Sequence, residues 1–559
     1  MFKENQKHRQ VTIYGMVHQF PAGMMKRLEK SWAPAFRKLI FEKIDERRYA
    51  ELYSTVDSRP NFPVNIWVGL EILKGMFDYT DEELIDQFHF NLLTARALGQ
   101  DNLGDITLSE RTIYYNRERL LAYEARTGRN LLEEEFQSIT DEALAKLKIN
   151  TKVQRMDSSM VGSFIKQLSR LELIAKVLQN FYRDLAESEQ ARWKERLGEY
   201  IEETAGHLAY QLRRAEVEAH LQKLGSLLFE LHQGYAYDAG INNLQSYQHV
   251  SRLLLEQYNI RISPERTTIE VKPAQEISAA SLQNPADDTA TFRHKNGENY
   301  KGDLLNVTET CEPDNPVQLL TDISVYPNLA ADDVILSERI PEIKTRTGVA
   351  EMVVDGGYSG EKSEIACQQE SVSLIPTEVK GRKLPADEVS LAEFHFEGPE
   401  IVSCPEGQAP QQQIHKSASH HIVHFAKEVC AQCPRRKSCL VRCGKKCYSL
   451  IYNERQVLLS RRRQQLGETA YRIKCRLRPA VEGTVSQFKR HLRNGKLRVR
   501  GLGRIRNSII LLAIGINFGR IWAYCQKYKR GSALLPATFI FFVKVLGSQT
   551  VKNQRSLGF

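Results

Sequence analysis

The chain has 559 residues, 42% of them hydrophobic and 26% charged, which is the composition of a soluble protein with three or four domains. Much of its net charge of +10 lies in the C-terminal third, and this asymmetry favours a polyanionic partner such as DNA or RNA. The polar start and the short apolar runs Ser508–Ile516 and Ala533–Leu546 lead us to expect no signal peptide and no membrane segment. Ten cysteines in such a chain indicate reduced thiols in a cytoplasmic protein.

Residues 1–145 show the patterns of a helical domain. Apolar side chains recur at helical spacing over residues 66–76, and Thr80 and Glu83 form a capping box for the next helix. Ser109 is the predicted N-cap of a basic helix whose outward side chains are Arg111, Tyr114, Arg117 and Arg119. Short helices that end in a basic one fit a helix-turn-helix reader, so we predict that Arg111 and Tyr114 contact DNA. A helical packing or dimerisation domain is the alternative.

The period of the pattern changes at residues 151–157, where alternating side chains predict a strand with Asp157 near its end. Residues 164–262 then return to long helices with apolar stripes, which predicts an inserted helical bundle. An aspartate at a strand end is typical of a site in α/β folds, although a turn or cap residue is the simpler interpretation of one such residue.

Residues 263–400 alternate between strands and helices. The predicted elements are strands 300–309 and 317–326, helix 332–344, strand 351–354, helix 359–369 and strand 372–376. Together with strand 151–157, this order predicts an α/β fold with a mixed sheet covered by helices. Asp355 follows strand 351–354 and precedes two glycines, so its carboxylate would be exposed at the strand's end; a plain Asp-Gly turn is the alternative.

Six of the ten cysteines lie between residues 404 and 447. Cys430 and Cys433 have the spacing of a metal-binding knuckle, and Cys404 and Cys439 could complete a tetrahedral zinc site, with His420, His421 and His424 as possible substitutes. A closed site of four ligands would be structural. Free thiols in a small core are the alternative, and the basic residues around the knuckle suggest contact with DNA.

Residues 471–530 contain sixteen Lys or Arg residues and one carboxylate, Glu482. Arg478 lies four residues before Glu482 and Lys489 seven after it, so a helix that begins near Arg478 presents all three on one face. An acid between two phosphate-binding cations suits metal chemistry on a nucleic-acid backbone, whereas a solvated Arg–Glu pair is the alternative. A basic loop with Arg498, Arg500 and Arg504 follows, and the apolar helix 508–522 would pack the helix of Glu482 onto the sheet.

Asp157, Asp355 and Glu482 form one hypothesis if they converge in space. Three carboxylates repel one another unless cations lie between them, and hard oxygen ligands suit Mg²⁺ or Mn²⁺. Two such ions ~3.5–4 Å apart can activate a nucleophile and stabilise the leaving oxygen of a phosphodiester. Arg478 and Lys489 would hold the phosphates. We find no phosphate-binding loop of the nucleotide-binding type and expect no nucleotide cofactor.

The chain resembles a bacterial insertion-sequence transposase of the DDE class, which has an RNase H-like catalytic fold. Val354-Asp355-Gly-Gly-Tyr358 matches the second-acid motif of this class, and Arg478-x-x-x-Glu482 with Lys489 seven residues later matches the third. Arg155-Met-Asp157-Ser-Ser matches the first-acid strand. The chain departs from the family pattern at Cys475 and Asp303, where a Tyr is common.

The resemblance implies a domain plan and a reaction. The expected units are a DNA-binding or dimerisation domain 1–145, a first catalytic strand 146–163, a helical insertion 164–262, a catalytic core 263–400, a zinc-ribbon-like insertion 401–450, a basic segment 451–530 and a tail 531–559. Metal-activated water would cut double-stranded DNA at the terminal inverted repeats, and the freed 3′-OH would attack target DNA. We expect a homodimer or a larger synaptic complex at the bacterial nucleoid. The alternatives are a metal-dependent nuclease that does not join DNA and an inactive zinc-containing repressor.

Overall fold

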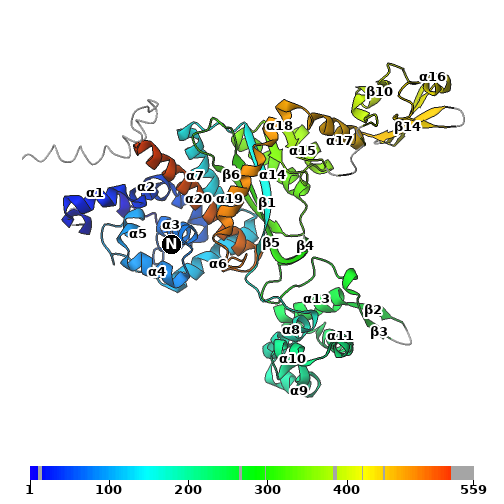
Figure 1. Cartoon of the computed structure of the whole chain (residues 1–559). Coiled ribbons are helices and arrows are strands. Elements are labelled where there is room, and N and C mark those ends of the chain that lie inside the picture. The colour runs from blue at the N-terminus through cyan, green and yellow to red at the C-terminus, as the bar shows by residue number, and fades with distance from the viewer. Residues whose placement is uncertain are drawn as a thin grey trace, which may run out of the picture.

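A mixed sheet of six strands lies at the centre of the chain (Figure 1). The computed structural model describes residues 1–10, 15–263, 267–295, 297–379, 381, 385, 387–417, 420–444 and 447–530. The strands are β1 Val153–Gly162, β4 Thr291–Lys295, β5 Glu298–Thr310, β6 Leu320–Pro327, β7 Glu351–Val354 and β8 Ser373–Pro376. β5 pairs antiparallel with β1, β4 and β6, whereas β7 pairs parallel with β1 and β8. The predicted α/β class with a mixed sheet is therefore confirmed.

Strand β1 continues further than the sequence predicts. Asp157 lies in the middle of the strand and not near its end, because residues 158–162 still pair with β5. The parallel pairing of β1 with β7 stops earlier, at Arg155 and Val353. Asp157 is therefore placed beside the end of β7, where the chain turns at Asp355.

Helices cover both faces of the sheet. The crossovers α14 Asp332–Thr347 and α15 Glu361–Gln369 join β6 to β7 and β7 to β8, and their apolar residues pack against Met156 and Val354. The other face carries α19 Val481–Lys489 and the long helix α20 Leu502–Arg530. Apolar packing on both faces explains why the short strands β7 and β8 consist almost entirely of buried side chains.

The N-terminal helices share a core with the sheet. They are α1 Ala22–Lys30, α2 Trp32–Leu39, α3 Val64–Phe77, α4 Asp81–Phe90, α5 Leu92–Ala97, α6 Glu110–Thr127 and α7 Leu131–Leu147. The predicted capping box of Thr80 and Glu83 and the N-cap at Ser109 are confirmed. Phe36 of α2, Phe518 of α20 and Val307 of β5 belong to one apolar cluster. The N-terminal helices therefore have no separate core, because both they and the sheet pack on α20.

Helix α20 contains the apolar run Ser508–Ile516, which is part of a 29-residue helix. We expected the run Ser508–Ile516 to be too short to cross a membrane. The whole helix is long and apolar enough to do so by length and composition, so this expectation does not apply to the helix as a whole. Most of its apolar window is buried within the protein, between the N-terminal helices and β6. The second apolar run, Ala533–Leu546, and the predicted tail 531–559 lie outside the described residues.

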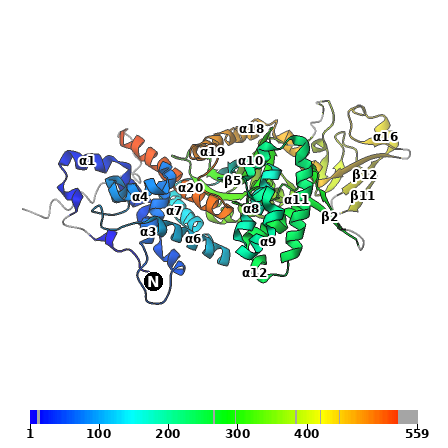
Figure 2. The ribbon, with the colours of Figure 1, turned by 90° about the horizontal axis from the view of Figure 1, so that it is seen from below.

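A helical unit is inserted between β1 and β4 and has its own apolar core. Its helices are α8 Arg170–Asp184, α9 Glu187–Ile201, α10 Ala205–Gln211, α11 Arg214–Tyr235, α12 Ala239–Asn242 and α13 Gln245–Gln257. Figure 2 shows α8, α9 and α11 grouped together, and Figure 1 shows that this group lies apart from the central sheet. The hairpin of β2 Tyr258–Ile262 and β3 Thr267–Val271 packs on α11, so the unit extends beyond residue 262.

The cysteine-rich region forms small sheets of its own at one end of the molecule (Figure 1). Its elements are β9 His395–Glu397, β10 Glu400–Ser403, β11 Gln412–Ser417, β12 His420–Phe425, α16 Lys427–Ala431, β13 Arg442–Cys443 and β14 Tyr448–Asn453. Helices α17 Glu454–Gln465 and α18 Thr469–Cys475 lead back to the central sheet, where the Tyr471 hydroxyl donates to the Pro376 carbonyl at 3.1 Å. This return places α19 beside β1.

One buried acid on β5 makes the stability of the fold dependent on pH. Asp303 is 1% exposed, and neither carboxylate oxygen has a hydrogen-bond partner among the described residues. Burial, helped by the charge of Asp287, raises the pKa of Asp303 to about 7. A raised pKa means that folding favours the protonated acid, so the fold loses stability as pH rises from the ordinary carboxyl pKa through 7.

We expect Asp303→Asn to stabilise the protein at pH 8, by about 2 kcal/mol more than at pH 5. Thermal unfolding midpoints at the two pH values measure this difference, and Asp314→Asn, at an exposed aspartate, is the control. An equal effect of Asp303→Asn at both pH values would contradict the ionisation of this buried acid.

Candidate active site

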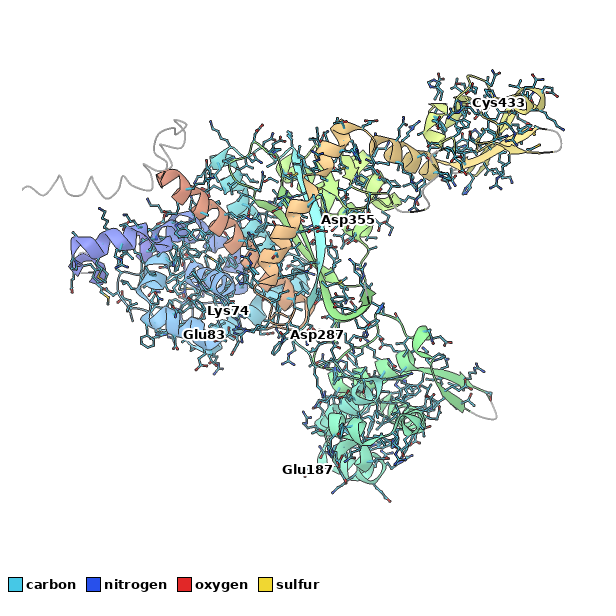
Figure 3. All side chains as sticks on the ribbon, in the orientation of Figure 1. Lys74, Glu83, Glu187, Asp287, Asp355 and Cys433 are labelled. Atoms are coloured by element: carbon cyan, nitrogen blue, oxygen red, sulfur yellow. The ribbon has the colours of Figure 1, made fainter. Side chains whose placement is uncertain are left out.

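The three predicted acids meet around the guanidinium group of Arg478. Arg478 Nη2 lies 2.9 Å from Asp157 Oδ1 and 3.8 Å from Asp355 Oδ2, and Nη1 lies 3.1 Å from Glu482 Oε1. These acids come from the middle of β1, from the turn after β7 and from the first turn of α19. Figure 3 shows Asp355 in the region of the central sheet, distant from Glu187 in the inserted unit and from Cys433. Residues more than 300 positions apart along the chain thus contribute to one cluster.

Asp157 is the buried member of the cluster. Its Oδ1 accepts the backbone N–H of Ser158 at 2.9 Å. Burial raises the pKa of Asp157, and the charge of Asp355 adds to this shift, while the Arg478 guanidinium and the Ser158 N–H oppose it. Asp157 is thus held between a second acid, Asp355, and the Arg478 cation.

A tight turn fixes Asp355. Its Oδ1 accepts the backbone N–H of Gly357 at 2.6 Å. A side chain at Gly356 would bring a Cβ atom within 2.9 Å of the Glu378 carbonyl oxygen, so only glycine fits there. Tyr358 is fully buried beneath the turn and donates its hydroxyl to Asn306 Oδ1 at 2.7 Å. The sequence Asp-Gly-Gly-Tyr therefore produces a partly exposed carboxylate on a rigid support.

Glu482 is the exposed member of the cluster, with 68% of its side chain accessible. Helix α19 begins at Val481, and Arg478–Ala480 form a short 3₁₀ turn before it, so the predicted helix start near Arg478 is three residues early. Val481, Val485 and Phe488 bury the opposite face of α19 against the sheet. Lys489 ends the helix, exposed to solvent, and has no ion pair in the part of the chain that the structure describes.

A buried ion network lies beneath the acid cluster and was not predicted from the sequence. Glu309 of β5 is fully buried and accepts hydrogen bonds from Arg155 at 2.8 Å, Arg520 at 2.8 Å and the Thr484 hydroxyl at 2.6 Å. Arg155 also donates to the Leu477 carbonyl at 2.7 Å, directly before Arg478. The network joins β1, β5, α19 and α20, and so positions Glu482 relative to Asp157. The sequence signal that could have indicated this network is Glu309 itself, a charged residue near the end of the apolar strand β5.

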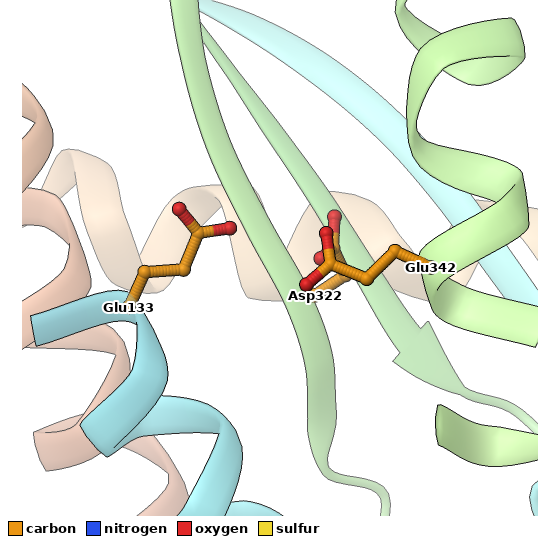
Figure 4. A group of neighbouring side chains, drawn as sticks. All are labelled: Glu133, Asp322 and Glu342. Atoms are coloured by element: carbon orange, nitrogen blue, oxygen red, sulfur yellow. The ribbon is translucent and has the colours of Figure 1, made fainter. Parts of the chain in front are cut away.

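Figure 4 shows a second group of three acids, and each of them forms an ion pair with Arg339. Ligand atoms of Glu133, Asp322 and Glu342 lie within 4.8 Å of one another. Arg339 donates to Glu133 Oε1 at 2.7 Å and to Asp322 Oδ2 at 3.1 Å, and lies 3.2 Å from Glu342 Oε2. Asp322 is 1% exposed, and Arg339 already occupies the space among the three carboxylates. We interpret it as the ion cluster that fixes α7 to β6 and α14.

Tyr114 of α6 and the three arginines of the basic loop line one cavity, whereas Arg111 is not part of its lining. This cavity of about 390 Å³ lies between α3, α6 and the start of α20, and its lining includes Tyr114, Arg498, Arg500 and Arg504. Arg498 Nη2 lies 3.1 Å from Asp78 Oδ2, and Arg504 Nη2 lies 2.6 Å from Glu118 Oε1. Arg500 is exposed. The basic loop is thus held against the N-terminal helices.

Two residues of α6 do not point outward as predicted. Arg117 pairs with Glu71 and Asp81, with shortest distances of 2.8 and 2.7 Å, because these acids on α3 and α4 face it across the helix contact. Arg119 lies over the rings of Tyr53 and Tyr115. Arg111 is exposed, and Tyr114 is 47% exposed, so these two remain available to a partner.

The cysteine-rich region brings its four predicted ligands into one neighbourhood. Cys430 and Cys433 lie at the end of α16 and Cys404 follows β10. Burial raises the pKa values of the Cys430 and Cys439 thiols, and the charges of the neighbouring cysteines add to both shifts. No three of these sulfurs lie within 4.8 Å of one another, because within the described residues only the acid group around Arg339 meets that criterion. The sulfurs are therefore further apart than in a closed metal site. Cys447 Sγ lies 3.2 Å from His424 Nδ1, and Lys445 and Lys446 fall outside the described residues.

Residues 403–522 match the family model described as a transposase DDE domain. This match supports a DDE transposase and covers 120 of the 559 residues. The match includes Arg478, Glu482 and Lys489 together with the cysteine-rich region, whereas Asp157 and Asp355 precede it. Neither a curated protein nor a solved structure matches the chain.

Divalent metal ions are the general cofactor of DDE transposase domains, and DNA is their substrate. The residue types of this chain suit such an ion, and Arg478 now occupies the space between the three carboxylates, whose ligand atoms do not all lie within 4.8 Å of one another. Asp157, Asp355 and Glu482 supply hard carboxylate oxygens, which are the ligands that Mg²⁺ and Mn²⁺ prefer. The exposure of Glu482 leaves one side of the cluster open to a large substrate.

Proposed function

We propose that this protein is a DNA transposase that cleaves the ends of an insertion sequence and joins the freed 3′-OH to target DNA. The observation that carries the proposal is the convergence of Asp157, Asp355 and Glu482 at an open position next to basic side chains. The sheet order β6-β5-β1-β7-β8, with crossover helices after β6 and β7, supports an RNase H-like catalytic fold. The DDE domain match supports transposition over other phosphodiester chemistry.

The three acids would hold two Mg²⁺ or Mn²⁺ ions, whose chemistry is to activate water and to stabilise the leaving oxygen. Asp157 is fixed by the sheet and Asp355 by its turn, so neither needs to move. Arg478 pairs with all three carboxylates here, and cations among the acids would release its guanidinium toward a phosphate oxygen. Lys489 lies two helical turns from Glu482 and would bind the next phosphates.

The DNA would follow a basic path along α18, α19 and the loop after it. Arg472, Arg476 and Arg490 are exposed on this path, close in sequence to Arg478 and Lys489. Tyr114, Arg500 and Arg111 would extend the contact onto the N-terminal helices. Neutralising several phosphates in this way makes binding strongly dependent on salt. We propose that the protein acts in the bacterial cytoplasm, on nucleoid DNA, as a homodimer or a larger synaptic complex.

We further propose that Cys404, Cys430, Cys433 and Cys439 bind a structural Zn²⁺ ion. The four cysteines lie close enough for neighbouring thiols to shift the pKa values of Cys430 and Cys439, and thiolate sulfur is a usual zinc ligand, so a bound ion would draw the four sulfurs together. Such a site would stabilise the small sheets of the cysteine-rich region, which has a limited apolar core of its own.

Cys433→Ser is expected to remove about one equivalent of zinc per chain and to lower the thermal unfolding midpoint of the cysteine-rich region. Elemental analysis and protease sensitivity of residues 395–453 measure the two effects. Cys443→Ser, at an exposed cysteine, is the matched control and should keep the zinc. If the unmodified protein contains no zinc and Cys433→Ser leaves the unfolding midpoint unchanged, the proposed zinc site is wrong.

The function is tested with purified full-length protein, Mg²⁺ and labelled DNA of the element ends. Cleavage followed by joining to a second DNA supports the proposal. Cleavage without joining would show that the protein is a nuclease. Binding without cleavage would show that it is a repressor. The DNA sequence around the gene provides an independent check, because terminal inverted repeats are expected on both sides.

A further inference from the structure

The cavity between α3, α6 and the start of α20 has an apolar floor. Its volume of about 390 Å³ lies in the usual range of about 300–1,000 Å³ for sites that bind small organic molecules. Trp67 of α3, Leu132 of α7 and Leu512 of α20 line it, and each of them is 2% exposed. A cavity of about 150 Å³ is enough to hold benzene, so this one has room for a molecule with two fused rings.

Helices α3 and α20 pack closely beside the cavity. A Cβ atom at Gly75 of α3 would lie 3.3 Å from Leu512 Cα, so the backbones of the two helices nearly touch at this point. Gly75 and Leu512 both belong to the lining. A small shift of α20 toward α3 therefore cannot close the cavity, because the two backbones would collide.

The lining carries more positive than negative charge. Each acid of the lining forms an ion pair with a Lys or Arg side chain that also lines the cavity, and these acids are Glu71, Asp78, Asp81 and Glu118. Arg500 lines the cavity as well, but it is exposed and has no ion pair among the described residues. Because the acids are already neutralised, an anion is the charged group that the cavity can still accept.

Two buried N–H groups of the lining lack an acceptor. Trp67 Nε1 and Arg498 Nη1 have no hydrogen-bond partner within the part of the chain that the structure describes. Both groups can only donate hydrogen bonds. Buried donors are nearly always paired in folded proteins, so these two call for an explanation. A bound molecule that carries acceptor oxygens would supply the missing partners.

We propose that this cavity binds a small organic anion, whose apolar body lies on the floor and whose carboxylate lies at Arg498 and Arg500. A guanidinium group suits a carboxylate because it can donate two parallel hydrogen bonds to it. The exposed side chains of Tyr114 and Arg500 mark the opening through which the molecule enters. The lining does not include the three acids around Arg478, so the site is distinct from that cluster and does not depend on the proposed transposition reaction.

Naphthoate is the probe, because it joins an apolar body of two fused rings to a carboxylate. Equilibrium dialysis against full-length protein without DNA is expected to give about one bound molecule per chain, with a dissociation constant of about 0.1–1 mM. Naphthamide, which has a similar shape but no charge, should bind about 10-fold more weakly. Arg500→Ala should weaken naphthoate binding by about 10-fold, and Ser508→Phe, which fills the cavity, should abolish it. Arg59→Ala, at an exposed arginine outside the lining, should match the unmodified protein.

Arg500→Ala changes an exposed side chain, so this variant is expected to fold, and Ser508→Phe is first compared with the unmodified protein by circular dichroism. Naphthoate binding that neither substitution weakens would place the molecule elsewhere and overturn the proposal. Equal affinity for naphthoate and naphthamide would show that the cavity does not select an anion. No bound naphthoate at millimolar concentration would overturn the proposal as well.

Discussion

Glu482→Gln is expected to reduce cleavage of element ends by about 10³-fold or more while it leaves their binding nearly unchanged. The substitution keeps the shape and exposure of the side chain but removes one of the three carboxylate charges around Arg478. Two acids hold divalent ions less firmly than three, whereas phosphate contacts from Lys489 and the basic loop persist. Glu482→Gln should therefore bind element ends but fail to cleave them.

A gel-shift titration measures binding of labelled ends, and single-turnover cleavage in Mg²⁺ measures chemistry on the same preparation. Glu468→Gln is the matched control, because Glu468 is exposed and lies on the same basic segment without contact to the acid cluster. Loss of binding together with retained cleavage would defeat the assignment of Glu482 as a metal ligand. Asp157→Asn and Asp355→Asn should behave like Glu482→Gln.

Glu309→Ala is expected to destabilise the sheet region by about 3–5 kcal/mol, which is the cost of leaving buried charges without their partner. Glu309 is fully buried and receives both Arg155 and Arg520, so its removal leaves two guanidinium groups uncompensated within the core. Thr484 of α19 also loses its acceptor. Cleavage should fall as well, because α19 carries Glu482.

Urea unfolding followed by tryptophan fluorescence, with hydrogen exchange of residues 153–162 and 298–310, measures this loss. Glu195→Gln, at an exposed position of the inserted unit, is the control and should change stability by less than about 0.5 kcal/mol. Unchanged exchange in β1 and β5 after Glu309→Ala would show that the network does not hold the sheet together.

The sheet could be predicted from the sequence because its strands have short-range signals. Strand 351–354 has the predicted bounds, and the order of strands and helices from β5 to β8 is the predicted one. Alternation and apolar runs report which residues face a core, and these patterns are local. The end of β1 was predicted too early. Residues 158–162 are held in the strand by pairing with β5, and pairing with a distant strand cannot be recognised from the local sequence pattern.

Tertiary relationships were harder to predict for the same reason. The N-terminal helices looked like a separate domain, yet α20, which begins 355 residues after the last of them ends, completes their core. Arg117 looked like an outward basic residue, but Glu71 and Asp81 from neighbouring helices neutralise it. Spacing on one helix cannot reveal a partner on another.

The acid cluster could be predicted because each acid lies in a recognisable local frame. Asp355 has its glycine turn, and Glu482 has cations four residues before it and seven after it. The sequence predicted Arg478 as a phosphate ligand, whereas in this structure its guanidinium lies among the acids. Glu309 and its two arginines were missed, because the acid and its partners lie on three different elements.

Metal-directed cleavage of the protein backbone tests the convergence of the three acids most directly. Fe²⁺ replaces Mg²⁺ in the full-length protein, ascorbate and peroxide generate hydroxyl radicals at the bound ion, and mass spectrometry locates the cuts. Cuts clustered near residues 157, 355 and 482, and suppressed by excess Mg²⁺, are the result that we predict. Cuts near Glu133, Asp322 and Glu342 instead, in a protein that still cleaves element ends, would contradict the assignment.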